Sequence, residues 1–294
     1  MDLTKSIVYN GLTIASTSGT TGGTPWGGVA INAIDYTDAD IDQYLDKRAI
    51  QDGIDAADVY YGARRIAIDA SVFGTTRGDT FDRLEDFAYA FDPVIAYNAD
   101  TANIGFLPFQ FYQPTADIST WSTSAFPSGI PLQFYARPMT PAKWSVSRDN
   151  SGGVAGLGLS IRVSSVLLAR DPRKYLQTSI QSDITTATQT ATYRGNYQSW
   201  PVITFSMSAA GNSATIIAIA GGSVQINLAT TTSGTYTLDY ATRTIKNSSD
   251  VLVTGLFATS VTQDYRQVKS GSTFSVSHTT GFSSLTLTYR EAFI

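Results

Sequence analysis

The stretch that decides the architecture is VSSVLLARDPRKYLQTSIQSDITTATQTATYRGNYQSWP, which spans residues 163–201. Its first part is an alternating apolar run that ends in the polar turn Asp171-Pro172-Arg173. Its middle is rich in Thr, Gln and Ser, which indicates extended chain, and new alternating runs begin after Trp200-Pro201. We therefore expect two β-rich domains, residues 1–178 and 199–294, joined by an extended connector at residues 179–198.

Composition narrows the class of protein. The 294 residues are enough for two domains with separate cores, and only 15% are charged. The chain has no cysteine and one histidine, His278, which excludes disulfides, thiolate catalysis and most histidine chemistry. No apolar run approaches the roughly 20 residues of a membrane helix. Residues 1–5 do not begin a signal peptide, so we expect neither membrane insertion nor signal-directed export.

Charge is distributed unevenly along the chain. Residues 1–58 carry nine acidic and three basic side chains, whereas residues 199–294 carry four acidic and five basic ones. A nucleic-acid-binding surface needs clustered Lys and Arg to displace counterions from phosphates. The sequence therefore predicts no such surface, but an acidic wall past which DNA moves without binding is compatible with it.

The first half contains one strong hairpin signal and one helix. Asn10-Gly11 lies between two short apolar runs, a pattern typical of a tight β-hairpin. Residues 77–91 predict an amphipathic helix that is capped at Asp79 or Thr80 and stopped before Pro93. Its apolar stripe consists of Phe81, Leu84, Phe87, Ala88 and Phe91. A single helix of this kind normally covers a sheet or plugs a barrel, so we assign the stripe to the core.

Two charged segments of the first half leave alternatives open. Residues 35–58 are acidic, but an EF-hand loop starting at Asp38 would need Gly and Glu where Gln43 and Ala49 stand. The secondary structure there is either a helix or a strand that enters the turn at residues 51–53. Arg64 and Arg65 begin an alternating strand. They form either a phosphate clamp or, as we favour, a surface pair that faces the acidic segment.

Two aromatic strands, residues 104–112 and 130–135, flank a long polar segment. The intervening residues 113–129 contain exposed-type aromatic residues among Ser, Thr and Pro, which is typical of an interface arm. We expect Trp121 and Phe126 to be its anchors.

From residue 199 onward the apolar residues alternate with a period of two, and Gly, Asn and Ser turns separate the runs. This pattern predicts an antiparallel sandwich. We expect no catalytic, cofactor or metal site. His278 stands at a strand end without a marked triad, and no nucleotide-binding or zinc motif is present, although a glycosidase with two carboxylates stays open. A carbohydrate-binding module is an alternative that would use Trp200, Tyr236, Tyr240 and Tyr265, of which Tyr236 and Tyr240 better suit a core.

The order of several motifs carries a family resemblance across nearly the whole chain. The hairpin at Asn10-Gly11, the segment 60–66 and the helix are followed by LARDPRKY at residues 168–175. GNYQSWPVITF at residues 195–205 and the Leu238-Asp239-Tyr240 run with Arg243-Thr244-Ile245 come next. This order resembles the distal tail protein (Dit) family of long non-contractile phage tails.

The resemblance implies an N-terminal belt domain, a β-barrel or sandwich with one α-helix, followed by a galectin-like or carbohydrate-module-like antiparallel sandwich. It implies a structural protein of the virion tail tip, assembled in the host cytoplasm as a ring of six. Expected partners are the tail tube protein, the hub protein and receptor-binding or side-fibre proteins, with DNA passing the lumen unbound. Interface candidates are Trp121, Phe126, Arg64, Arg65, Asp171, Arg173 and Tyr175.

Overall fold

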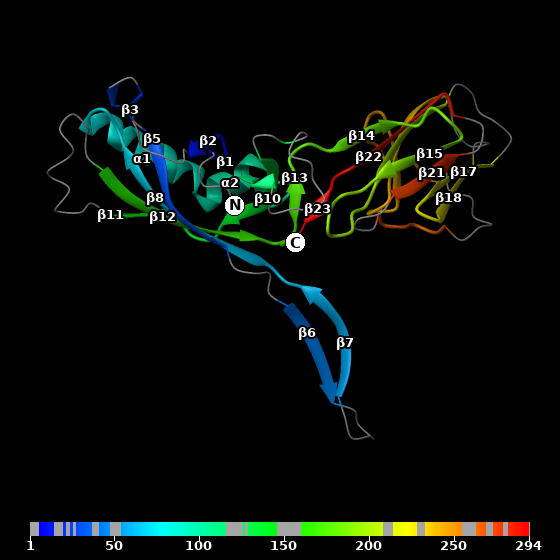
Figure 1. The fold of residues 1–294 in the computed structure, drawn as a ribbon, viewed down its shortest axis with the longest axis horizontal. Helices are drawn as coiled ribbons and strands as arrows, with labels where there is room; N and C mark the ends of the chain where they lie inside the picture. The colour runs from blue at the N-terminus through cyan, green and yellow to red at the C-terminus, as the bar shows by residue number, and fades with distance from the viewer. Residues whose placement is uncertain are drawn as a thin grey trace. The chain divides into compact units, whose positions relative to one another are not determined.

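The computed structural model describes the chain in two compact units, residues 1–174 and 175–294 (Figure 1). The described residues are 6–14, 20–21, 24–25, 28–36, 41–47, 54–115, 126, 129–145, 160–207, 214–227, 233–254, 263–268, 273–278 and 282–293. Within them no helix has the length and apolar character needed to cross a membrane.

The first unit is built on one curved antiparallel sheet with the strand order β2-β1-β9-β10-β12-β8-β5. The two end strands of this order, β2 and β5, also contact each other, so the sheet is a nearly closed barrel, as expected. A short strand, β11, pairs with β12. The bounds are β1 (Ile7–Tyr9), β2 (Leu12–Ile14), β5 (Gly28–Tyr36), β8 (Arg64–Phe73), β9 (Leu107–Gln113), β10 (Ile130–Pro138), β11 (Lys143–Ser145) and β12 (Ser160–Ala169).

Two hairpins complete the strands of the first unit. The Asn10-Gly11 prediction is confirmed, because both residues have positive φ angles, 46° and 80°, and join β1 to β2. The acidic segment is not helical: β6 (Ile41–Lys47) and β7 (Ile54–Tyr61) pair with each other in a separate two-stranded sheet. A further small pair consists of β3 (Thr20–Thr21) and β4 (Thr24–Pro25).

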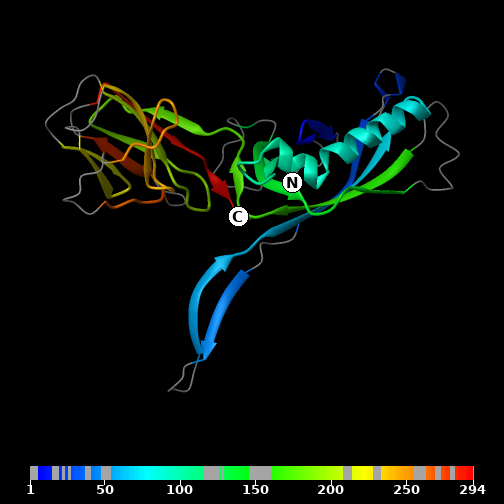
Figure 2. The ribbon, with the colours of Figure 1, turned by 180° about the vertical axis from the view of Figure 1, so that it is seen from behind.

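Helix α1 (Arg77–Ala90) lies across one face of the sheet, where Figure 2 shows it in front of the strands. Its N-cap is Thr76 and not Asp79 or Thr80 as predicted, since the Thr76 side chain accepts a hydrogen bond from the Asp79 amide at 3.1 Å. Asp79 instead accepts from the Thr75 amide, which lowers the pKa of its carboxyl. Leu84, Phe87 and Phe91 are buried, which confirms the predicted stripe at these positions.

A second helix, α2 (Pro93–Ala99), was not predicted, and the expectation of a single helix is wrong. Pro93 follows the end of α1, but it also occupies the first turn of α2, where the amide hydrogen that proline lacks would have no partner within the helix. Asp92 caps this turn and accepts from the amides of Val94 at 2.7 Å and Ile95 at 3.0 Å. The aromatic strand predicted from Ile104 begins only at Leu107, because Ile104 lies in a turn with φ of 56°.

The core of the first unit is aromatic. Phe87 and Phe91 of α1 stack at 4.5 Å between ring centroids, and Phe91 stacks on Tyr9 of β1 at 5.0 Å. The Tyr9 hydroxyl donates to the Ala136 carbonyl at 3.2 Å, and burial raises its pKa. These contacts attach the helix to β1 of the sheet.

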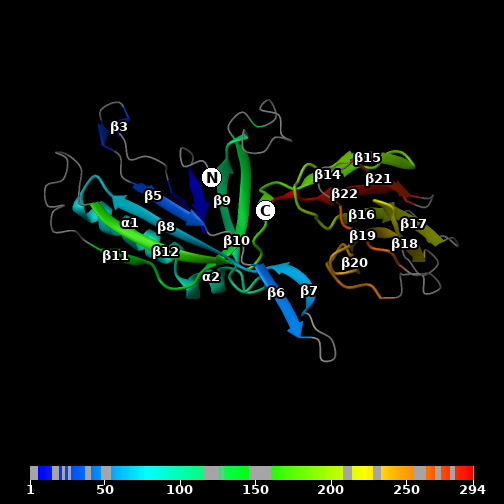
Figure 3. The ribbon, with the colours of Figure 1, turned by 60° about the horizontal axis from the view of Figure 1, so that its bottom comes forward.

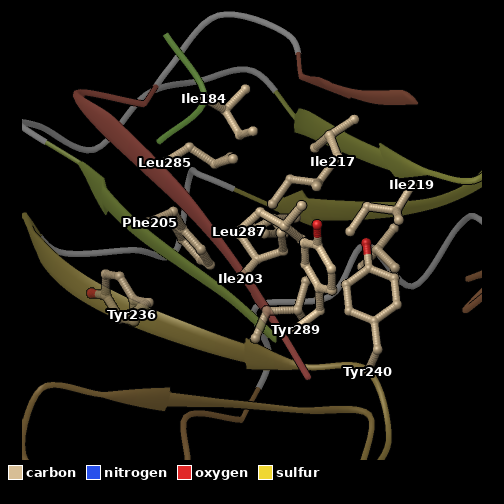
Figure 4. Packing of buried hydrophobic residues seen from close by; sticks show 14 of the residues in the cluster. Ile184, Ile203, Phe205, Ile217, Ile219, Tyr236, Tyr240, Leu285, Leu287 and Tyr289 are labelled. Carbon is tan, nitrogen blue, oxygen red and sulfur yellow. The ribbon is translucent and has the colours of Figure 1, made fainter. Parts of the chain in front are cut away.

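The second unit is an antiparallel sandwich, as predicted. One sheet has the order β14-β22-β16-β19-β20 and the other β15-β21-β17-β18, and a single apolar core lies between them (Figure 4). The sandwich strands are β14 (Ile180–Asp183), β15 (Thr188–Thr192), β16 (Val202–Met207), β17 (Ala214–Ile219), β18 (Gly222–Asn227), β19 (Gly234–Asp239), β20 (Thr244–Asn247), β21 (Thr273–His278) and β22 (Ser284–Tyr289). Outside these two sheets, β13 (Lys174–Leu176) pairs with β23 (Ala292–Phe293).

The predicted connector at 179–198 is part of this sandwich. β14 pairs with β22 and β15 pairs with β21, and Tyr193 is fully buried in the core. The division between the units falls between Lys174 and Tyr175, rather than at residues 178 and 199. The Thr- and Gln-rich composition resembles that of a linker because these strands lie at sheet edges and expose alternate polar residues.

The position of the boundary is testable with fragments. A fragment of residues 175–294 retains both edge strands and Tyr193, so we expect one cooperative thermal transition by near-ultraviolet circular dichroism. A fragment of residues 199–294 exposes the core face that β14 and β15 cover, so we expect no cooperative transition. If both fragments unfold with equal cooperativity, the second domain begins at Ser199 and residues 175–198 are not needed for its fold.

The contribution of α1 is testable with two aromatic substitutions on one helix. Phe87→Ala removes a fully buried ring, and we expect the free energy of unfolding to fall by about 3–5 kcal/mol. Tyr89→Ala removes a ring that is 62% exposed and should change it by less than about 0.5 kcal/mol. Denaturant unfolding of the two variants measures the difference, and similar losses would show that α1 does not form the core.

Candidate functional site

Strand alternation leaves one face of the first sheet open. On β8 and β12 the residues that face α1 are buried, and their neighbours, such as Asp69, Arg162 and Ser164, lie on the other side. In Figure 3 this side of the sheet faces the viewer, and α1 lies behind the strands. We call the part formed by β5, β8, β11 and β12 the open sheet face.

The open sheet face carries a hollow of about 520 Å³. The hollow exists because several of the side chains on this face are small, among them Ala33, Ala67 and Ser164. Lys143 and Arg162 also line it, together with Asp35 and Asp69. The combination of a small-residue floor and charged groups is suited to receiving a protruding group from another molecule.

A polar network orders one side of the hollow. The Arg162 guanidinium donates to the Asp69 carboxylate in a forked arrangement, with Nε at 3.0 and 3.1 Å from the two oxygens. Asn32 donates to Asp69 at 3.3 Å and to the Ser71 hydroxyl at 2.9 Å. The hydrogen bond from Arg162 is the main cause that lowers the pKa of Asp69, so the pair is charged at neutral pH.

The outer face of α1 is a second exposed surface. Asp82, Glu85, Asp86 and Tyr89 recur at helical spacing and are all exposed. Within the described chain none of these three carboxylates makes an ion pair, and Tyr89 is 62% exposed. The first unit thus has an acidic surface on helix α1 and a hollow lined by polar and charged residues on the far side of the sheet.

The predicted surface pair Arg64 and Arg65 is wrong for Arg64. Consecutive residues of a strand point to opposite faces, so Arg64 is only 4% exposed and its guanidinium carbon lies 5.3 Å from the Phe134 ring centroid. Arg65 is exposed at the end of the open sheet face. The phosphate-clamp alternative is wrong for the same reason, because the two cations do not converge.

The other interface candidates fall into separate places. Asp171 and Arg173 are brought together: the carboxylate accepts from the Arg173 amide at 3.1 Å and from Nε at 2.7 Å, which rigidifies the turn after β12. Tyr175 is half-buried at the start of the second unit. Phe126 is half-buried, and its carbonyl accepts from the Thr115 hydroxyl at 2.9 Å. Trp121 lies outside the described residues.

The surroundings of His278 and Glu291 bear on whether the described chain holds a catalytic or metal site. His278 packs edge-on against Phe282 at 5.8 Å, and the described residues hold no group of three His, Cys, Asp or Glu suited to a metal. Glu291 is fully buried, which raises its pKa, and its Oε1 accepts from the Arg194 amide at 2.8 Å. This buried pair is structural, since it joins chain segments almost a hundred residues apart.

The candidate sugar-stacking aromatics belong to the second core. Tyr236 is 5% exposed and Tyr240 is fully buried. Figure 4 labels both among the residues of this core. Tyr265 packs edge-on against Tyr240 at 5.4 Å, and Trp200 packs partly buried against the same core. The four rings therefore do not form an exposed platform for sugar binding.

Sequence reasoning missed the hollow and the outer face of α1 as surfaces. Both consist of residues that alternate with core positions, and the sequence signals only the core half of such a pattern. The uninterrupted set of carboxylates on the polar side of α1 was visible, but it was interpreted only as a complement to the helix dipole.

The electrostatics of the hollow are testable by titration. Arg162→Gln removes the main hydrogen bond to Asp69, so the pKa of Asp69 should rise towards its ordinary value of 3.8. Because the native pKa is depressed, stabilisation by the pair is present above that ordinary value and is lost as the pH falls through the native pKa. Carboxyl NMR titration measures the shift. Arg65→Gln on the same face is the control, and an equal shift in that variant would contradict the assignment.

Comparisons with known proteins concern the fold of the whole chain. No protein-family profile and no curated protein sequence matches the chain. The crystal structure of the Dit protein (gp 19.1) of phage SPP1 is similar, with a TM-score of 0.61 and 15% identity, over 98% of this chain and 99% of that one. The baseplate of phage P2 in its activated conformation with Ca gives a TM-score of 0.43 and 6% identity over 90% of each chain. On the SPP1 similarity, this chain has a phage distal tail protein-like fold.

Proposed function

We propose that this protein is a structural distal tail protein of a long-tailed phage, located at the tip of the virion tail. The observation that carries the proposal is the similarity to the SPP1 Dit protein over 98% of this chain and 99% of that chain. A shared sandwich alone would match one unit, whereas this similarity includes the barrel unit and the sandwich unit together. The SPP1 protein is described as a hub adsorption protein of phages that infect Gram-positive bacteria.

In the proposed assembly the first unit, the belt domain, forms a ring of six subunits that joins the tail tube protein to the hub protein. A closed ring uses a heterologous interface, in which each subunit offers two different surfaces to its two neighbours. The open sheet face and the outer face of α1 are two such surfaces on different layers of one unit. Their difference in shape and charge supports a head-to-tail arrangement.

We propose that DNA passes the centre of the ring without specific binding. Residues 1–58 carry nine acidic and three basic side chains, so this part of the chain does not attract phosphates. The second unit, a galectin-like sandwich in this proposal, faces outward, where receptor-binding or side-fibre proteins attach. Assembly takes place in the host cytoplasm, and no catalytic step is required of the protein. Tyr236 and Tyr240 are buried, and Trp200 and Tyr265 are partly buried against the same core, which counts against the sugar-binding alternative.

Negative-stain electron microscopy and mass photometry of the purified full-length protein test the proposal. We expect six-fold rings with a central opening and a particle mass of six chains, because ring closure satisfies both surfaces of every subunit. Addition of the purified hub protein of the same phage should give a stacked complex. Single chains at every concentration, with no complex with the hub protein, would refute the ring.

A further inference from the structure

The outer face of α1 is built to contact something outside its own subunit. Asp82, Glu85, Asp86 and Tyr89 form one continuous exposed stripe, while the opposite side of the helix is buried in the core. Tyr89 is 62% exposed, although a tyrosine ring contributes strongly to the energy of an interface when it is buried. We call these four residues the acidic helix face.

The open sheet face has the complementary charge. Its basic residues outnumber the acidic ones: Arg65, Lys143, Arg162 and, directly after β12, Arg170 are exposed, whereas of its two carboxylates Asp35 is exposed and Asp69 is half-buried. Arg162 forms an ion pair with Asp69, and Lys143 and Arg170 then outnumber Asp35. Lys143 makes no ion pair within the described residues.

The shapes of the two surfaces also match. A helix carrying a projecting tyrosine is convex, and the hollow of about 520 Å³ is floored by small side chains such as Ala67 and Ser164. Helix α1 covers one side of the sheet (Figure 2). The hollow is lined by residues of the other side, such as Asp69 and Ser164, so a single subunit cannot bring the two surfaces together. Two copies can do so, and the pair then keeps one free helix face on one copy and one free sheet face on the other.

We propose that the acidic helix face of one subunit packs on the open sheet face of the next, with Tyr89 seated in the hollow beside Lys143. The inference rests on the proposed function, since repetition of this contact is what generates the ring. It assigns a direction to the ring, with the helix of each subunit pointing to the same neighbour. The occupant of the hollow is a second copy of this chain, and the tube and hub proteins bind elsewhere.

Site-specific cross-linking tests the proposal directly, because the natural chain has no cysteine. Asp86→Cys and Ser164→Cys place one thiol on each surface, and both positions are exposed. A short bismaleimide added to the double variant should produce a covalent ladder that ends at six chains on a denaturing gel. A mixture of the two single variants should stop at dimers, and each single variant alone should stay monomeric.

The matched control combines Asp86→Cys with Ser223→Cys, an exposed serine of the second unit. A ladder from this pair equal to that from the Ser164 pair would overturn the proposal, and so would dimers from Asp86→Cys alone, which indicate a symmetric contact. If microscopy shows rings but the Asp86→Cys and Ser164→Cys double variant gives no ladder, the ring is supported and this interface is refuted. A ladder without closed rings would support the interface and count against the ring.

A charge swap provides independent support. Asp82→Lys with Glu85→Lys should weaken self-assembly at least about tenfold at low salt, since like charges then face each other. Adding Lys143→Glu and Arg170→Glu to the same chain should restore assembly. Both variants change exposed residues, and unchanged circular dichroism confirms that they fold. Failure of the second pair to rescue the first would show that the two surfaces do not meet.

Discussion

The stacking of Phe87 on Phe91, and of Phe91 on Tyr9, is the contact on which the first unit depends. The end strands β2 and β5 do not pair with each other, and α1 contacts both of them as well as β8 and β12. Three stacked rings, 4.5 and 5.0 Å apart, join the helix to the first strand. Because this side of the helix is buried in the core, its carboxylates and Tyr89 must face outward, and the far side of the sheet stays uncovered.

The second unit uses its aromatic residues differently. Tyr236 and Tyr240, which could have offered stacking surfaces, fill the space between two sheets, and Phe205 stacks on Tyr236 at 5.6 Å. The strands β14 and β15 each form one edge of a sheet and expose polar side chains such as Thr and Gln. The first unit differs, since charged side chains lie on the outer face of α1 and line the hollow.

The predictions from sequence succeeded where the local signal and the tertiary environment agree. The Asn10-Gly11 hairpin and the apolar stripe of α1 follow from backbone preference and helical spacing, and the structure keeps both. They failed where one residue type serves two roles. Pro93 begins a helix instead of ending one, and Arg64 is buried although arginine is usually exposed. The Thr- and Gln-rich segment belongs to the sandwich because its strands pair with β22 and β21 and because Ile184 and Tyr193 enter the core.

The sequence by itself determined the class of each half, since periods of 2 and 3.6 residues follow from the geometry of single strands and helices. The lack of cysteine and the single histidine are also read directly from the sequence, and they rule out disulfides within the chain. Only the tertiary structure decided where the units divide and which polar residues converge. Asp69 and Arg162 are 93 positions apart, and the register of β8 against β12 alone makes them neighbours. Because a surface is formed by residues that are far apart in the sequence, no local sequence pattern predicts it.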